Sequence, residues 1–163
     1  MFFLQKLPTD HILQDFSKKY PDMQVVNVSA CLHLLKVASE LLRELEGHFS
    51  KNGLSQARFL ALIVLEREKS HQLKCIDMTQ ALGVSKPNIT RLLDSLEADG
   101  LIERRGSKED KRCSMIAITT EGSRALASVL PGYYRIMNQA MKPFDSNSKE
   151  KLIQLLGQVA TGS

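Results

Sequence analysis

Residues 85–91, SKPNITR, carry polar side chains of the kinds that bind nucleic acid. They follow the glycine turn LGV and precede the leucine-rich segment LLDSL. In a helix over this segment, the set outside the apolar stripe is Ser85, Lys86, Asn88, Thr90 and Arg91. Their hydroxyl, amide and cationic groups reach DNA phosphates and base edges, and the positive end of the helix dipole adds to the attraction. We therefore predict that the start of this helix contacts DNA.

Three carboxylates lie farther along the same predicted helix, at Asp94, Glu97 and Asp99. A carboxylate beside phosphate is repelled, so the far end of the helix is predicted to stay away from DNA. This polarity is typical of a recognition helix that enters the major groove with its N-terminal residues.

A second group of charged side chains lies between residues 104 and 112, in a predicted hairpin. The basic members are Arg104, Arg105, Lys108, Lys111 and Arg112, and the acidic ones are Glu109 and Asp110. An arginine on a hairpin tip can enter the narrow minor groove, and Asp110 can hold Arg112 in one rotamer by a charge-assisted hydrogen bond. We predict DNA contacts for Lys108, Lys111 and Arg112, with Asp110 as the brace. The alternative is a solvated hairpin whose charges prevent edge-to-edge aggregation.

Hydrophobic periodicity, caps and turn residues predict the elements that position these groups. We expect helices over 9–20, 25–51 and 55–68, a polar loop at 70–74, a short helix ending at Gly83, and a helix between Ser85 and Gly100. Leu82 and Val84 are expected to plug the junction of the last two helices. Strands over 101–105 and 113–119 follow, then a helix over 120–144, kinked or broken at Pro131-Gly132, and a last helix over 146–162. Two helices joined by a turn, followed by a charged hairpin, indicate a winged helix-turn-helix.

Composition indicates an ordinary folded protein, with 163 residues, 43% hydrophobic residues and a net charge of +4. The three cysteines, Cys31, Cys75 and Cys113, include no CxxC pair, so neither a disulfide framework nor a zinc site is predicted. A reducing cytoplasm is the simplest location. The apolar start MFFLQ is too short for a signal peptide, and we expect no apolar run to approach the length of a membrane span.

Enzymatic chemistry is not predicted. The four histidines, His11, His33, His48 and His71, pair with no serine, cysteine or carboxylate in a catalytic spacing, and none forms an i, i+4 metal pair. No cofactor or metal is expected. A winged helix used as a protein-interaction module is the stronger rival, but it would need an apolar exposed helix face, and SKPNITR opposes that.

The segments LSQARFLALIVLE and MTQALGVSKPNITRLLDSLEADGLIERRGSKEDKRCSMIAITTEG resemble the MarR family of bacterial winged-helix regulators. DKR at 110–112 is similar to the D-x-R wing signature of that family, and ITTEG at 118–122 is similar to its LTxEG. The likeness covers about residues 28–160 in element order and is specific within 78–122.

The resemblance implies a homodimer that binds a pseudo-palindromic operator in double-stranded DNA and acts as a regulator, most often a repressor. It implies a mainly α fold with a small β-hairpin wing and a helical dimerisation region. The expected divisions are an N-terminal extension at 1–24, a dimerisation helix at 25–52, the winged helix-turn-helix at 53–120 and C-terminal dimerisation helices at 121–163. Half-sites should lie roughly 10 bp apart. The wide apolar faces of the terminal helices agree with a dimer.

The resemblance also implies control by a small aromatic or phenolic effector, or by cysteine oxidation. Candidate polar contacts for an effector are His33, Arg43 and Arg58. Cys31 is the redox candidate, but its neighbours Leu35 and Leu45 are leucines, and an apolar setting makes a thiol inert. We expect Cys31 to be a buried structural cysteine, and redox sensing through it stays open as an alternative.

Overall fold

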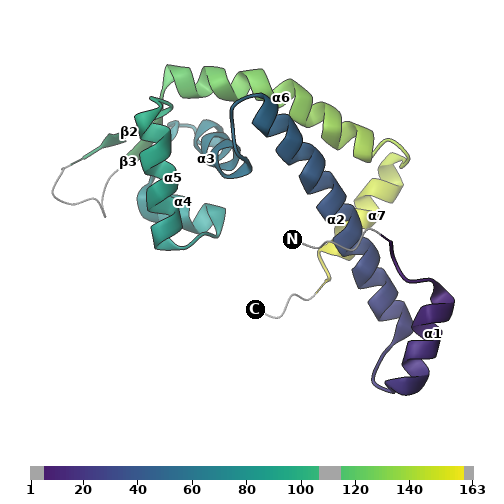
Figure 1. Cartoon of the computed structure of the whole chain (residues 1–163). Helices are drawn as coiled ribbons and strands as arrows, with labels where there is room; N and C mark the ends of the chain where they lie inside the picture. Colours follow the sequence, from purple (N-terminus) through teal and green to yellow (C-terminus); the bar gives the residue numbers. More distant parts are fainter. Residues whose placement is uncertain (1–5, 107–114, 160–163) are drawn as a thin grey trace. The chain divides into compact units, whose positions relative to one another are not determined.

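The computed structural model describes residues 6–106 and 115–159, so the wing-tip predictions Lys108, Asp110, Lys111 and Arg112 lie outside the described residues. The chain is mainly helical with one small sheet (Figure 1). In order, the elements are α1 (Asp10–Lys19), α2 (Val25–Lys51), α3 (Gln56–Arg67), β1 (Gln72–Lys74), α4 (Cys75–Leu82), α5 (Lys86–Ala98), β2 (Ile102–Arg105), β3 (Met115–Ile118), α6 (Thr120–Ala140) and α7 (Ser146–Leu156). The predicted helices and both wing strands are confirmed, with ends shifted by a few residues.

Side chains cap several helices at their starts. The Thr9, Ser55 and Thr119 hydroxyls accept hydrogen bonds from backbone N–H groups in the first turns of α1, α3 and α6. At α7, the hydroxyl and the backbone N–H of Ser148 donate to Asp145 and hold the pKa of that carboxyl below its usual range. Capping satisfies N–H groups that have no partner inside the helix, which explains why these helices begin where they do.

The chain divides into two compact units, Met1–Leu45 and Glu46–Ser163, and α2 crosses the boundary. In the first unit, α1 buries Leu13, whereas Ile12, Phe16 and Tyr20 are about half exposed. The Phe16 and Tyr20 rings stack with centroids 6.0 Å apart. The predicted i, i+4, i+8 stripe of α1 is thus present, but its side chains are exposed.

Helix α2 also exposes apolar side chains. The exposed members are Val26, Leu34, Leu35, Val37 and Leu42. By length and composition α2 could cross a membrane, and no part of its apolar window is buried in the described chain, so the expectation that no segment reaches that length is wrong. The expectation was based on unbroken apolar runs. A helix can have a high average hydropathy although it contains a few polar residues, such as Ser29 and His33. An amphipathic helix that packs against a partner meets the same criterion.

The core of the second unit lies between α3, the helix-turn-helix and α6. Phe49, Phe59 and Tyr133 form an aromatic cluster, with the Phe49 and Phe59 rings 4.3 Å apart. Around it, the fully buried side chains are Leu62, Leu65, Met78, Ile89, Leu93, Leu96, Ile116, Leu126 and Val129. The predicted apolar stripe of α5 is therefore confirmed as a buried face. This core holds α5 and the wing strands in one unit.

The sheet has three strands in the order β1-β3-β2, all antiparallel. Sequence analysis predicted a loop at 70–74, and that prediction is wrong for Gln72–Lys74, which pair with β3 from Gln72 opposite Ala117 to Lys74 opposite Met115. Three residues with one apolar side chain, Leu73, carry no periodic pattern. The strand forms because β3 offers it a free edge of hydrogen-bonding groups.

We predicted a kink or a break at Pro131-Gly132. Helix α6 runs unbroken from Thr120 to Ala140 with Pro131 inside it, so the break is wrong, and the kink stays a prediction. A proline removes one backbone hydrogen bond, but the remaining bonds and the packing of Leu126 and Val129 hold the helix together. Gly132 contributes by leaving room for the ring of His48, whose Nε2–H donates to the Val129 carbonyl at 2.9 Å.

His71 has a φ of 53°, in the left-handed region that side chains with a Cβ disfavour. Its carbonyl accepts from the Ile118 amide at 3.1 Å, which ties this backbone to the end of β3. We expect His71→Gly to stabilise the protein by about 0.5–1 kcal/mol, because glycine adopts this conformation without strain. Urea denaturation at equal protein concentration measures the change. The neighbouring Ser70→Gly, at an ordinary φ, should lower stability, and equal effects of the two changes would contradict the explanation.

Candidate DNA-binding surface

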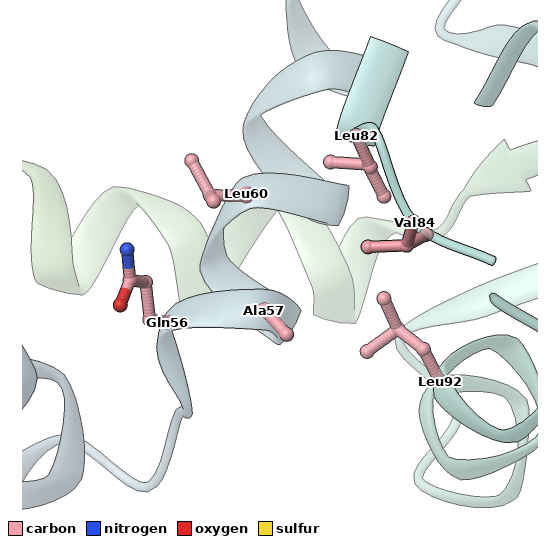
Figure 2. A pocket seen from close by; sticks show the side chains of 6 residues that line it. All are labelled: Gln56, Ala57, Leu60, Leu82, Val84 and Leu92. Carbon is pink, nitrogen blue, oxygen red and sulfur yellow. The ribbon is translucent and has the colours of Figure 1, made fainter. Parts of the chain in front are cut away.

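The helix-turn-helix consists of α4, a turn at residues 83–85 and α5. Gly83 makes the turn in the left-handed conformation, at φ 61°, as a glycine at a helix C-terminus does. Leu82 and Val84 were expected to plug the junction, but they are only half buried and line an open cavity of about 180 Å³. Figure 2 shows Ala57, Leu60 and Leu92 on its other walls, with Gln56 as the polar member. Short apolar side chains at a steep helix crossing leave this space unfilled.

The polar residues predicted on α5 all lie on its exposed side. Ser85, Lys86, Asn88, Thr90 and Arg91 are exposed, while Ile89, Leu93 and Leu96 on the other side are almost fully buried. Pro87 is in the first turn, where its missing N–H has no cost. No acidic residue occupies that first turn. The structure therefore brings the five predicted residues together at one end of one helix.

Most of these five polar side chains keep their hydrogen-bonding groups available for a ligand. Ser85 occupies the N-cap position, as predicted, but its side chain makes no capping hydrogen bond. The Thr90 hydroxyl donates to the Lys86 carbonyl at 3.0 Å, which keeps its oxygen lone pairs for other donors. Among the described residues, neither Lys86 nor Arg91 has a carboxylate within ion-pair distance. The start of α5 thus presents two cations and three neutral polar groups.

The three carboxylates at the far end of α5 each have an arginine partner, which was not predicted from the sequence. Arg104 of β2 donates through one terminal nitrogen to Asp94 Oδ1 and through the other to Glu97 Oε2, each at 2.7 Å. Arg58 of α3 pairs with Asp99. These ion pairs were not predicted from the sequence. A signal was present, since Asp94 and Glu97 share a helix face and an arginine follows in the next strand.

The described part of the wing comprises β2 and β3. Ile102 faces Ile118 and Arg105 faces Met115 in the antiparallel register. Arg105 is exposed and its Nε–H donates to Glu103 Oε1 at 2.8 Å. The predicted contact residues of the wing tip are outside the described chain.

The candidate effector and redox residues lie on two helices, with Cys31, His33 and Arg43 on α2 and Arg58 on α3. His33 Nδ1 lies 2.8 Å from the Ser29 carbonyl within α2, and Arg43 is exposed on the same helix. Arg58 pairs with Asp99, as described above. Cys31 is exposed in the single chain, so the prediction of a buried cysteine is wrong there, because the apolar α2 face around it has no cover. The effector role of His33, Arg43 and Arg58 stays a prediction.

A helix-turn-helix with a polar recognition helix, followed by an antiparallel wing, defines the class of winged-helix DNA-binding proteins. Residues 54–114 match the model of the MarR family. The transcriptional repressor YetL of Bacillus subtilis is 30% identical over 156 residues, which cover 96% of this chain and 93% of that protein. The chain therefore belongs to the MarR family.

Two further proteins are similar to this chain. The transcriptional repressor MprA of Escherichia coli K12 is 32% identical over 136 residues, which cover 83% of this chain and 76% of that protein. The crystal structure of Sco3205, a MarR family transcriptional regulator from Streptomyces coelicolor solved in complex with DNA, superposes with a TM-score of 0.75. That match covers 82% of this chain and 85% of Sco3205, at 17% identity, and so shows a shared fold.

Proposed function

We propose that this protein is a sequence-specific transcriptional regulator that binds double-stranded DNA as a homodimer and acts as a repressor. The observation that carries the proposal is the group of exposed polar side chains at the start of α5, with the opposite helix face in the core. Side chains at this end of a recognition helix contact phosphates and base edges in the major groove. YetL and MprA, named as repressors, support the repressor role.

The exposed apolar faces support the homodimer. Residues 25–52 and 121–163 are the proposed dimerisation parts around the winged helix at 53–120, and residues 1–24 are the N-terminal extension that precedes them. Within these three segments, the exposed apolar side chains include Phe16, Tyr20, Leu35, Val37, Ile153 and Leu155. A soluble monomer rarely exposes that much apolar surface, because its contact with water is unfavourable. A second copy would cover these faces and place two recognition helices on successive half-sites of a pseudo-palindromic operator.

The remaining parts of the proposal concern the wing and control. Lys108, Lys111 and Arg112 contact the flanking DNA, with Asp110 as the brace, and a small aromatic or phenolic effector releases the protein in the cytoplasm. His33, Arg43 and Arg58 are the proposed polar contacts of that effector. The exposure of Cys31 favours a second candidate, release by oxidation of this thiol, because access is a requirement for oxidation. No enzymatic activity is proposed.

We expect Lys86→Ala/Arg91→Ala to weaken DNA binding by roughly 1–3 kcal/mol per residue, because each change removes a cation from the start of α5. The slope of log affinity against log salt should also fall by about 0.9 for each lost phosphate contact. Fluorescence anisotropy measures both quantities with a duplex that the wild-type protein has selected from a random-sequence library.

A matched control removes the same charge elsewhere. Arg67 and Lys69 lie outside the helix-turn-helix and the wing strands, and both are exposed. Arg67→Ala/Lys69→Ala should bind within about twofold of the wild type, since charges far from the phosphates are screened. Equal losses in the two double variants would show that net charge, and not α5, causes binding.

A further inference from the structure

Arg104 bridges the wing and the recognition helix. It lies in β2 opposite Ile116, and its side chain is only 20% exposed. Its two terminal nitrogens each donate at 2.7 Å, one to Asp94 and one to Glu97. The two acids stand at i and i+3 on α5, so a single guanidinium connects two positions about one helical turn apart to a strand. A lysine lacks the rigid planar fork that lets two separate nitrogens each face one carboxylate.

In the absence of Arg104, the two carboxylates would disfavour binding of an anion such as DNA. The side chains of Asp94 and Glu97 are 54% and 40% exposed, on the same helix that carries Lys86 and Arg91. Without a partner, two negative charges on this helix would lower the positive potential in front of its first turns. In the structure both share the guanidinium of Arg104, whose single positive charge offsets half of their combined charge.

Arg105 provides the contrast. It neighbours Arg104 in β2, but its side chain is 61% exposed and it pairs with Glu103 of its own strand. This pair connects nothing across elements, and an exposed ion pair contributes little. Two adjacent arginines therefore have different structural roles, although the sequence presents them as equals.

We propose that Arg104 is a positioning residue for DNA binding, which offsets one of the two negative charges of Asp94 and Glu97 and connects the first wing strand to the recognition helix. The proposal rests on the proposed DNA-binding function and deepens it. Arg104 acts through the two carboxylates and not by contact with phosphate, because both of its terminal nitrogens are already engaged. DNA affinity therefore depends on a residue outside the predicted contact set.

Four variants test this role: Arg104→Met, Asp94→Asn/Glu97→Gln, the triple combination, and Arg105→Met as the matched control. Each is titrated with the duplex selected by the wild-type protein, over a range of salt concentrations. Arg104→Met should bind on the order of tenfold more weakly at low salt, because the summed charge of the three side chains changes from −1 to −2. The triple variant should bind at least as tightly as the wild type, since the summed charge at these positions is then 0. Arg105→Met should lose no more than about threefold.

The rescue separates the role of Arg104 from two others. A direct phosphate contact would lower the salt slope by about 0.9 in Arg104→Met and would persist in the triple variant, which would overturn the proposal. A purely structural role would appear as equally low melting temperatures in Arg104→Met and the triple variant, without recovery of affinity, and would also overturn it. If the wild type itself bound no duplex at any salt concentration, the proposed function would fail, and this proposal with it. Weak binding confined to Arg104→Met and its triple variant would reject this proposal alone.

Discussion

Gly122→Ala is expected to destabilise the winged-helix unit by about 3 kcal/mol, at the upper end of the cost of overpacking. An added Cβ at Gly122 would lie 2.1 Å from the carbonyl oxygen of Leu101 and 2.8 Å from Cγ1 of Ile118. The first contact is with backbone, which cannot change rotamer. Leu101 also cannot move away freely, because its carbonyl accepts from the Thr119 amide at 3.1 Å.

The same junction is fixed by a side chain. The Thr119 hydroxyl donates to the Gly100 carbonyl at 2.7 Å and accepts from the Gly122 amide at 3.0 Å. The first turn of α6 thus lies directly against the turn that leads into β2. Displacing it would move the base of the wing, so DNA binding should weaken together with stability.

Urea denaturation at equal protein concentration measures this effect, and Gly47→Ala is the matched control. A Cβ at Gly47 meets nothing within 4 Å, so alanine there should stabilise the helix by about 0.5–1 kcal/mol through its higher helix propensity. Opposite signs for the two substitutions are expected. A Gly122→Ala protein as stable as the wild type would show that α6 does not approach Leu101 this closely.

Gly132→Ala is expected to cost about 2 kcal/mol for a different reason. Its Cβ would lie 2.1 Å from Cε1 of His48, inside the imidazole ring's own space. The ring is held by its hydrogen bond to the Val129 carbonyl and packs beside Phe49 with centroids 5.9 Å apart. Moving the ring would break the bond and disturb the aromatic cluster.

A double-mutant cycle tests whether His48 is the cause. His48→Ala alone removes the hydrogen bond and leaves a space, and it should also destabilise the protein. In His48→Ala/Gly132→Ala the new methyl group occupies part of that space, so the combined cost should fall short of the sum by about 1 kcal/mol or more. Additive costs would mean that Gly132 matters for the backbone of α6 and not for the histidine.

Helices and strands with a periodic pattern of apolar residues were predictable from the sequence. Elements that form only because another part of the fold packs or pairs with them were not. The α2, α3 and α5 helices carry apolar stripes and end at glycines or caps, so their bounds follow from local rules. Strand β1 was missed because its pairing with β3 comes from the fold. The continuity of α6 through Pro131 was missed for a similar reason, since tertiary packing outweighs the local preference of proline.

The candidate site shows the same division. Residue type and helical spacing were sufficient to place Ser85, Lys86, Asn88, Thr90 and Arg91 on one exposed face. Spacing could not show that Arg104 reaches back seven and ten residues to two acids on α5, because that distance depends on how the wing folds over the helix. Charges were counted correctly in the sequence, but their pairing required coordinates.

Strand β1 has a consequence for how this chain can change in length. Lys74 ends β1 and Cys75 begins α4 with no residue between them, while the strand is held in register with β3. One residue inserted at this point would turn α4 by about 100° about its axis or shift the strand so that Leu73 faces the opposite side. The junction between β1 and α4 therefore does not tolerate insertions or deletions. Homologues should keep a constant number of residues here even where the residue types differ.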